Sequence, residues 1–254
     1  MCRLILARGR FDVAEIVQAA LGMSTGGTAD HESPVKCHPN GWGAVWRDPA
    51  EPGTLRVHRD PRTMADSWSA GPLCAARADV LAIHVRHATL PHTMGERFTH
   101  PLQRAGEAVP WYFMHNGFLP TVHRSLGLPA SRFDSAEYFD YLVPPGSAAI
   151  AAAAALRRLR AIPPGGSSGN AVVINPDRSY VVHWSPPGTP YPRYFSMHRL
   201  RRPGLDVVAS EVIPALGSGW TPLDADVVLD LPHPPFTGEE HEHGTRTDVA
   251  AGRR

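Results

Sequence analysis

Residues 1–11, MCRLILARGRF, place a cysteine directly behind Met1 and follow it with the apolar run LILA. The run predicts a short buried strand that starts at Cys2. Because cysteine is small, we expect Met1 to be removed, which leaves a thiol and a free α-amine on one residue. An α-amine has a pKa of about 7.7–8.0 and a thiol one of about 8.5, so the amine can accept the thiol proton near neutral pH. The stretch therefore combines a core strand with a nucleophile and its base.

The bulk composition narrows the class of protein. The chain has 254 residues, a net charge of +1 and 43% hydrophobic residues, which allows a large core and gives no sign of a nucleic-acid or membrane partner. LILA is too short for a signal peptide and no apolar run of about 18 residues follows, so we expect a cytoplasmic protein. The cysteines, Cys2, Cys37 and Cys74, lack metal or CxxC spacing. We expect free thiols, with Cys37 and Cys74 buried or half-buried.

The pattern along the chain predicts many antiparallel strands and few helices. A helix in residues 11–23 is expected to end at Gly22, and a helix in 133–143 is expected to have Asp134 or Ser135 as its N-cap. A third, alanine-rich helix is expected in 147–162. Strands or hairpins are expected in residues 2–8, 41–48, 54–60, 79–89, 109–119, 170–184, 194–213 and 221–231. With no βαβ rhythm and no GxGxxG, this indicates an α+β layered domain and gives no support to a nucleotide-binding fold.

Two charged residues have both a structural and a functional interpretation. Arg86 lies inside the apolar strand 79–89, where a charge is costly unless it is paired. It either forms a structural salt bridge or binds a ligand carboxylate, which a guanidinium holds with two hydrogen bonds. Strand alternation places His84 and Arg86 on one face and His87 on the other. Asp134 either caps its helix or receives a ligand ammonium.

Two polar segments also have both a structural and a functional interpretation. Asn116-Gly117 is the strongest hairpin-turn signal. Alternatively, the Asn amide and the Gly N–H donate to a developing oxyanion, where one donor is worth about 3–4 kcal/mol of barrier. Residues 40–43, NGWG, form either a turn into a strand or a place where the glycines beside Trp42 allow a ligand to approach the main chain.

Taken together, these residues describe an acyl-transfer site for an amide whose acyl part is an α-amino acid, such as glutamine or a γ-glutamyl compound. The ordered set Cys2, NGWG, HVRHAT, HNG and DS resembles the class II glutamine amidotransferases, a family of N-terminal-nucleophile (Ntn) hydrolases. The resemblance is closest to the stand-alone branch that includes the ergothioneine-pathway γ-glutamyl hydrolase, which Thr99-His100-Pro101 and Ser210-Glu211 also match. It implies a four-layer αββα sandwich of two antiparallel sheets over residues 2–232. Residues 233–254, rich in Pro, Gly, Glu and His, are expected to form a flexible polar tail.

The resemblance implies a role for each central residue. Cys2 would be the nucleophile, and Asn116 with Gly117 would form the oxyanion hole. Arg86 would bind the substrate α-carboxylate, and Asp134 would bind the α-amine. No metal or organic cofactor is implied.

Further contacts follow from the same resemblance. The main chain around His87 and Thr89 is expected to touch the glutamyl group, and Trp42 and Gly43 are expected to line the pocket floor. The family usually has a glutamate where this chain has Ala136, with Glu137 one place later. The contact made by that glutamate is therefore open.

The expected reaction is hydrolysis of the γ-amide of glutamine, or of a γ-glutamyl small molecule, through a γ-glutamyl thioester. One alternative is a glutaminase subunit that delivers ammonia to a separate synthase, and another is a catalytically silent binding module. Residues 24–39 and 90–101 are expected to border the pocket and select the leaving amine. The 14 histidines lack standard metal-ligand spacing. His241 and His243, with neighbouring glutamates, are expected to belong to a solvated tail.

Overall fold

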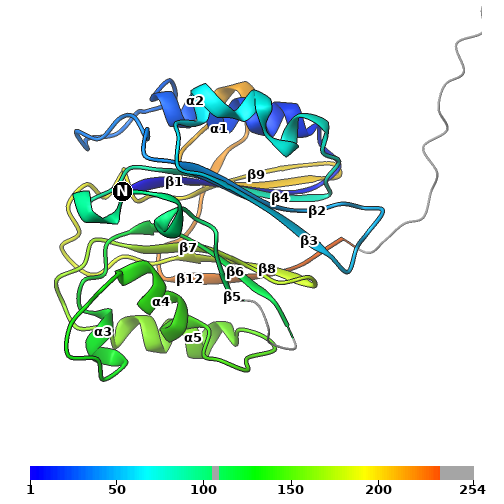
Figure 1. Ribbon diagram of the computed structural model, residues 1–254. Helices are drawn as coiled ribbons and strands as arrows, with labels where there is room; N and C mark the ends of the chain where they lie inside the picture. The colour runs from blue at the N-terminus through cyan, green and yellow to red at the C-terminus, as the bar shows by residue number, and fades with distance from the viewer. Residues whose placement is uncertain (105–108, 235–254) are drawn as a thin grey trace, which may run out of the picture.

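The computed structural model describes residues 1–104 and 109–234. The described chain forms four layers, with α1 and α2 over one sheet and α3, α4 and α5 over the other (Figure 1). In this part of the chain the strand orders are β11-β9-β10-β1-β4-β2-β3 and β12-β8-β7-β6-β5. All the strand pairs in both sheets are antiparallel. The predicted αββα sandwich of two antiparallel sheets is confirmed.

The elements have the following bounds. The strands are β1 Cys2–Gly9, β2 Trp42–Arg47, β3 Leu55–Asp60, β4 Val80–Arg86, β5 Leu102–Arg104, β6 Trp111–Gly117, β7 Gly169–Ile174, β8 Arg178–His183, β9 His198–Arg202, β10 Leu205–Ala209, β11 Thr221–Pro222 and β12 Val227–Pro232. The α-helices are α1 Val13–Thr25, α2 Met64–Ser67, α3 Val122–Ser125, α4 Asp134–Leu142 and α5 Ala152–Arg160. Short 3-10 helices are Trp68–Ala70, Pro72–Ala75, Pro91–Thr93, Glu96–Phe98 and Pro214–Leu216.

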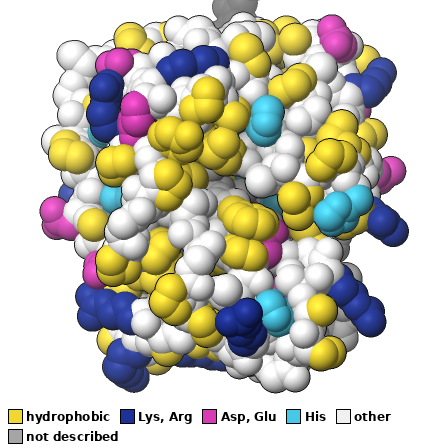
Figure 2. Space-filling model, turned by 90° about the vertical axis from the view of Figure 1, so that its left-hand side faces the viewer, with side chains coloured by type: hydrophobic (Ala, Val, Ile, Leu, Met, Phe, Trp, Pro, Cys, Tyr) yellow, Lys and Arg dark blue, Asp and Glu magenta, His cyan; other side chains and the backbone are white. Residues whose placement is uncertain are grey.

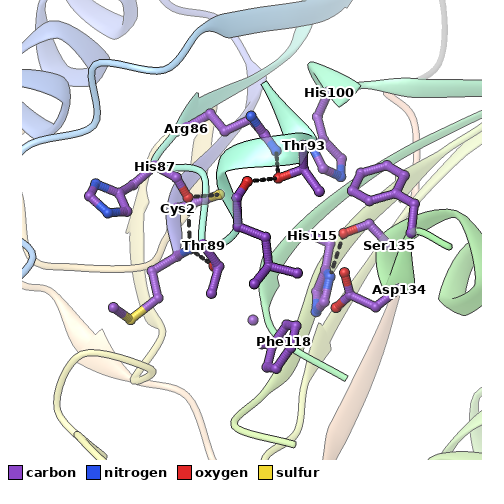
Figure 3. A pocket seen from close by; sticks show the side chains of 14 residues that line it. Cys2, Arg86, His87, Thr89, Thr93, His100, His115, Phe118, Asp134 and Ser135 are labelled. Atoms are coloured by element: carbon purple, nitrogen blue, oxygen red, sulfur yellow. Dashed lines mark hydrogen bonds between the residues drawn. The ribbon is translucent and has the colours of Figure 1, made fainter. Parts of the chain in front are cut away.

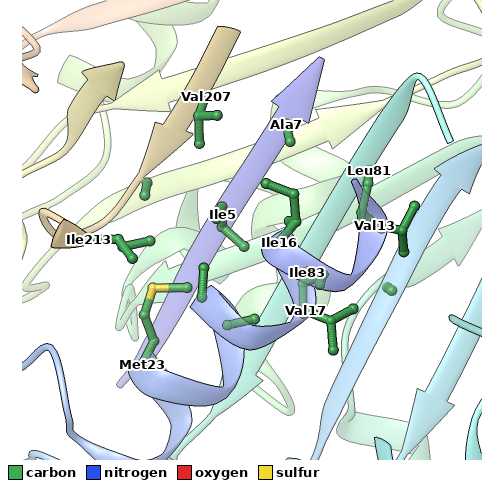
Figure 4. Packing of buried hydrophobic residues seen from close by; sticks show 14 of the residues in the cluster. Ile5, Ala7, Val13, Ile16, Val17, Met23, Leu81, Ile83, Val207 and Ile213 are labelled. Carbon is green, nitrogen blue, oxygen red and sulfur yellow. The ribbon is translucent and has the colours of Figure 1, made fainter. Parts of the chain in front are cut away.

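Strand β1 lies inside its sheet and is buried on both faces. Leu4 and Leu6 point between the sheets, where they pack with Met114 of β6. Ile5 and Ala7 point outward and pack under α1 (Figure 4). Complete burial of a leucine or isoleucine side chain stabilises the folded state by about 1.5–3 kcal/mol. Burial on both faces explains why LILA is a continuous apolar run without alternation.

Helix α1, Val13–Thr25, ends later in the chain than predicted. Asp12 caps its start by accepting a 2.9 Å hydrogen bond from the Ala14 N–H. The helix continues past Gly22 and ends at Gly26, whose φ of 82° is left-handed. The prediction of an end at Gly22 was wrong because glycine weakens a helix without stopping it, whereas a left-handed glycine terminates it.

The predicted N-cap of α4 was also wrong. The capping position is held by Phe133, which makes no side-chain cap, and Asp134 and Ser135 are the first two helical residues. Their side chains are bound elsewhere: Asp134 Oδ2 accepts from the Leu119 N–H at 2.8 Å, and Ser135 Oγ lies 3.0 Å from a ring nitrogen of His115. Tertiary contacts thus outweigh local capping at this helix end.

The structure also bears on membrane-spanning helices, on the exposure of two cysteines and on the end of the chain. Among the described residues, no helix is both long and apolar enough to cross a membrane. Cys37 and Cys74 are free but exposed, Cys37 in an irregular segment and Cys74 in the 3-10 helix Pro72–Ala75, so the prediction of buried or half-buried thiols was wrong. The predicted tail falls mostly on 235–254, outside the described residues. His233 itself is buried and lies 2.9 Å from Ser179 Oγ, and the domain boundary at 232 stays a prediction.

Candidate active site

A cavity opens where the ends of β1, β4 and β6 meet the start of α4. It encloses about 380 Å³ of space that is open to solvent. Cys2, Arg86, Gly117 and Asp134 line it, together with Thr89. Arg86 and Asp134 lie on opposite sides of the cavity, and Cys2 lies on a third (Figure 3). The structure therefore brings these residues, which are far apart in sequence, to one cavity.

Cys2 reaches the cavity from the inner face of β1. It pairs with Arg86 in the antiparallel register of β1 and β4, so the two side chains lie on the same face of the sheet. The thiol is 6% exposed and its Sγ lies 3.9 Å from the His87 carbonyl oxygen. Burial acts to raise the pKa of the Cys2 thiol, but the N-terminal ammonium, His84 and Arg86 outweigh it and hold the pKa well below its ordinary value. A thiolate is the nucleophilic form of cysteine.

The chain start lies at the mouth of the same cavity. The Met1 ammonium donates to the His87 carbonyl at 2.8 Å and to Thr89 Oγ1 at 2.9 Å. The Cys2 N–H donates to Asn116 Oδ1 at 3.0 Å. With Met1 attached this nitrogen is an amide, and removal of Met1 converts it into an amine at the same place.

Arg86 is buried and forms no ion pair with any residue that the structure describes. Its side chain is 4% exposed, its Nη2 donates to Thr93 Oγ1 at 3.1 Å, and its Nη1 has no hydrogen-bond partner within the described residues. Burial lowers the pKa of Arg86, and the charges of Cys2 and Asp134 counteract this effect. The salt-bridge interpretation of Arg86 was therefore wrong, and a donor remains free to bind an anion.

Asn116 and Gly117 are the last residues of β6, not a turn. They pair with Asn170 and Gly169 of β7, so the hairpin-turn interpretation was wrong. The Asn116 side chain is fully buried, and its Nδ2 has no partner among the described residues. A Cβ on Gly117 would overlap with the Ser168 carbonyl, so only glycine fits at this strand end. The site thus holds a buried amide donor with an unused hydrogen.

Asp134 projects from the first turn of α4. One carboxylate oxygen accepts from Leu119, and the other, Oδ1, accepts no hydrogen bond within the described residues. Glu137, one turn later, accepts from the Ser131 hydroxyl at 2.7 Å and from the main-chain N–H groups of Arg132 and Phe133 at 2.6 and 3.3 Å. Glu137 therefore fixes the loop that carries Asp134 to the cavity.

Trp42 and Gly43 do not line the cavity, so the prediction of a pocket floor was wrong. Trp42 points to the outer face of the sheet, into the core under α1, and its Nε1 donates to Ser67 Oγ at 2.8 Å. Gly43 lies one layer behind the cavity, where a Cβ would overlap with the carbonyl oxygen of His100. Because all of β2 is buried, its sequence has no polar alternation that could reveal which face meets the cavity.

Of the two loops expected to border the pocket, only one does. Thr93 and His100, from residues 90–101, line the cavity, whereas no residue of 24–39 does. From the latter loop, the Cys37 carbonyl lies 3.3 Å from a ring nitrogen of His87, which lines the cavity. Phe118 and Phe133 also line the cavity. Neither was predicted, but each directly adjoins a predicted site residue.

The described residues contain no group of three or more His, Cys, Asp or Glu side chains that could hold a metal ion. His241 and His243 lie outside the described residues. The thiol of Cys2, the guanidinium of Arg86 and the carboxylate of Asp134 line one cavity, and the Asn116 amide accepts a hydrogen bond from the Cys2 N–H.

Comparisons with known proteins bear on the family and the fold. The sequence model of the class-II glutamine amidotransferases matches residues 2–150. The structure of glutamine phosphoribosylpyrophosphate amidotransferase from B. subtilis resembles the chain with a TM-score of 0.63 at 15% identity, and a structure described as the allosteric regulatory enzyme of purine biosynthesis does so with 0.64 at 16%. Each match covers 94% of this chain but 50% of the other, so the chain spans about half the length of these enzymes.

A class-II glutamine aminotransferase domain protein from Silicibacter pomeroyi is similar in length. The match covers 92% of this chain and 100% of that one, with a TM-score of 0.51 at 16% identity. No curated protein sequence matches the chain. At these identities the solved structures show the fold alone, and the predicted Ntn-hydrolase fold is confirmed.

Proposed function

Because the chain belongs to the class II glutamine amidotransferases, we propose that it hydrolyses the γ-amide of glutamine or of a γ-glutamyl small molecule through a thioester on Cys2. The observation that carries the proposal is the set of unused groups close to Cys2, in the wall of the cavity or directly bound to Cys2. The thiol of Cys2 has a lowered pKa, and Arg86 Nη1 and Asn116 Nδ2 are buried donors without partners among the described residues. Buried polar groups without partners need an explanation, and a bound substrate provides one.

The first half of the reaction forms the thioester. The Cys2 sulfur attacks the γ-carbonyl carbon, and the carbonyl oxygen becomes an oxyanion that Asn116 Nδ2 and the Gly117 N–H stabilise. The Cys2 α-amine, exposed by removal of Met1, takes the thiol proton and gives it to the leaving nitrogen. The C–N bond breaks and the amine leaves.

The second half releases glutamate. Water attacks the thioester carbon, the same amine accepts a water proton, and the oxyanion donors act again. The C–S bond breaks, the sulfur regains its proton, and the γ-carboxylate leaves. No step needs a metal or an organic cofactor.

Recognition of the glutamyl group uses opposite charges on opposite walls. Arg86 binds the α-carboxylate through its free donor, and Asp134 binds the α-ammonium through Oδ1. His87 and Thr89 supply a carbonyl and a hydroxyl, which the Met1 ammonium occupies in the structure. Glu137 supports this wall by fixing the loop before Asp134, which offsets the absence of a glutamate at Ala136.

The test is release of glutamate from glutamine and from a panel of γ-glutamyl amines and γ-glutamyl peptides. The purified chain is first checked by mass for loss of Met1. We expect release from at least one compound, and we expect Cys2→Ala to abolish it while its thermal melting stays close to that of the wild type. Release by Cys2→Ala at the wild-type rate would contradict the mechanism, and no release from any compound would favour a silent binding module.

A second candidate is a glutaminase that passes ammonia to a separate synthase. Two of the exposed large apolar side chains among the described residues, Leu90 at 38% and Met94 at 49%, lie in the loop beside the cavity, where a partner would cover them. Preference for free glutamine and a rate that rises when a synthase is added would support this candidate. Preference for a larger leaving amine would support the hydrolase.

The exposed free thiols of Cys37 and Cys74 fit a reducing compartment, and we place the protein in the cytoplasm on that ground. Neither thiol has a role in the proposed reaction.

A further inference from the structure

A buried polar cluster lies behind Cys2, and the proposed reaction does not use it. It consists of Arg3, His38, Tyr194 and Glu211, and we refer to these residues as the anchor cluster. Their exposed fractions are 0, 1, 0 and 8%. Arg3 and Glu211 form an ion pair with 3.3 Å between Nε and Oε2. Burying so many polar groups costs folding free energy, so their presence calls for a role such as fixing a specific arrangement.

The anchor cluster lies beside the part of β1 that does not pair with β10. β10 pairs with β1 only from Gly9 back to Ile5. Ser210, the residue that follows β10, binds both main-chain groups of Leu4. Its N–H donates to the Leu4 carbonyl, and its Oγ accepts from the Leu4 N–H, both at 2.9 Å. Cys2 is two residues earlier, so its polar groups face the same edge of β1 and have no strand partner there.

Side chains bind both main-chain groups of Cys2 instead. The Cys2 N–H donates to Asn116 Oδ1 at 3.0 Å, and the Tyr194 hydroxyl donates to the Cys2 carbonyl at 3.1 Å. The first contact lies on the cavity side and the second belongs to the anchor cluster. The nucleophilic residue is therefore held from two directions by groups that a strand ladder would not provide.

The rest of the cluster immobilises Tyr194. The Arg3 guanidinium lies 3.9 Å from the centre of the Tyr194 ring, and its Nη1 donates to the Tyr194 carbonyl at 2.8 Å. Arg3 also donates to the Ser210 carbonyl at 3.1 Å. Glu211 Oε1 accepts from the Thr28 hydroxyl at 2.6 Å, which ties the loop after α1 to the same cluster. A ring held from its face and its main chain has little freedom to move its hydroxyl.

The protonation states make Tyr194 the donor. Burial raises the pKa of Tyr194, so the hydroxyl keeps its proton. His38 Nδ1 lies 3.1 Å from the Met23 carbonyl, which can only accept, so Nδ1 carries the ring proton. Burial and the Arg3 charge lower the pKa of His38 to about 2, which leaves its Nε2, 3.1 Å from the Tyr194 hydroxyl, as a second acceptor. The single Tyr194 proton is thus shared by Cys2 and His38, and Cys2 has no other donor to its carbonyl among the described side chains.

We propose that Tyr194 is a positioning residue for the nucleophile: its hydroxyl fixes the Cys2 carbonyl and thereby the direction of the Cys2 amine and thiol. The inference rests on the proposed function, in which those two groups attack and carry the proton. Without this hydrogen bond the first residue of β1 pivots on its contact with Asn116. A misplacement of about 1 Å at a reacting group costs up to about 100-fold in rate.

The test compares Tyr194→Phe with Tyr141→Phe. The two changes remove the same hydroxyl from the same kind of bond, because the Tyr141 hydroxyl donates to the Arg158 carbonyl at 2.9 Å in the helical layer away from the cavity. We expect Tyr194→Phe to lower kcat for glutamate release about 10- to 100-fold with KM within twofold of the wild type. Tyr141→Phe should keep kcat within twofold, and thermal melting of both variants provides the measure of folding.

A second readout does not depend on the reaction. The rate of Cys2 alkylation by iodoacetamide at pH 7, followed by peptide mass, should fall at least threefold in Tyr194→Phe and stay unchanged in Tyr141→Phe, because a displaced thiol leaves the positive groups that lower its pKa. If the wild type releases no glutamate, the proposed function fails while this readout still decides the role of Tyr194. Wild-type alkylation and kcat in Tyr194→Phe, or an equal loss in Tyr141→Phe, would overturn the inference.

Discussion

Arg86 carries a buried charge that forms no ion pair within the described residues. The side chain is buried, its hydrogen-bond partner Thr93 is neutral, and Nη1 has no partner within the described residues. An uncompensated buried charge destabilises a folded chain. The arrangement is therefore understandable as a site that a ligand carboxylate completes, and it implies that binding, not folding, explains this residue.

The residue-scale prediction concerns Arg86→Gln. We expect KM for the preferred γ-glutamyl substrate to rise about 10- to 100-fold, because a charge-assisted hydrogen bond to a carboxylate is worth about 1.5–3 kcal/mol. The unfolding free energy measured in urea should not fall, since an unpaired charge is removed. The control is the same substrate without its α-carboxylate, such as 4-aminobutanamide if glutamine is preferred. An equal loss of kcat/KM on both compounds would contradict the assignment of the carboxylate to Arg86.

At this scale the sequence was informative for residues whose chemistry is costly to bury. Arg86, Asn116 and Asp134 stand out in apolar surroundings. Arg86 and Asp134 line the cavity that Cys2 borders, and Asn116 accepts a hydrogen bond from the Cys2 N–H, although their roles in the reaction stay proposals. Trp42 was misplaced because an aromatic residue packs equally well on either face of a buried strand. Tyr194 was missed because the hairpin expected in 194–213 begins only at His198, and Tyr194 lies in the turn before it, where strand alternation does not indicate what its hydroxyl meets.

At the element scale, β2 supports the wall of the cavity from behind. The segment that carries His100 crosses β2 at Gly43, so closely that a Cβ there would overlap with the His100 carbonyl and lie 2.6 Å from that of His58. Both obstacles are main-chain atoms, which cannot rotate away. Glycine at this position therefore sets the distance between a strand and the loop that lines the cavity.

We expect Gly43→Ala to destabilise the chain by about 1–3 kcal/mol, the usual cost of overpacking, and to lower glutamate release by displacing His100. Gly53→Ala is the matched control, because no heavy atom lies within 4 Å of its Cβ position and its hairpin is remote from the cavity. Urea unfolding and the release assay give the two readouts. Equal unfolding free energies for the two variants would show that the crossing at β2 tolerates a side chain.

The sequence predicts the strands better than it predicts where the helices begin and end. The strands were predictable because β-branched and apolar runs persist through both sheets. Gly22 and the start of α4 were not, since a glycine tolerated inside α1 and a helix start without a side-chain cap at Phe133 depend on packing from other layers. The short 3-10 turns Pro91–Thr93 and Glu96–Phe98, which shape one cavity wall, are too brief to leave a periodic signal.

At the scale of the whole molecule, the sandwich buries several histidines in neutral form. Burial is the largest cause that lowers the pKa of His38 to about 2 and of His233 to about 4, and it lowers that of His100 well below its ordinary value. His38 lies behind Cys2, whereas His233 contacts the carbonyl of Pro176 in the turn between β7 and β8. Stability of the whole domain is therefore linked to pH through sites that are far apart.

This linkage gives a prediction with a definite sign. Below about pH 6.5 the unfolded chain binds protons on histidines that stay neutral when folded, so the unfolded state binds more protons and the unfolding free energy falls as the pH falls. For His38 the window runs from 6.5 down to about 2, and each pH unit within it costs about 1.4 kcal/mol. Urea unfolding at pH 7.5, 6.0 and 5.0 should show the decline, and His38→Gln should reduce it by about 2 kcal/mol between the first and last values. His92→Gln, at an exposed position, should keep the wild-type slope. A His38→Gln slope equal to that of the wild type would mean that His38 takes up its proton while the domain is folded, and the neutral acceptor next to Tyr194 would then be lost as well.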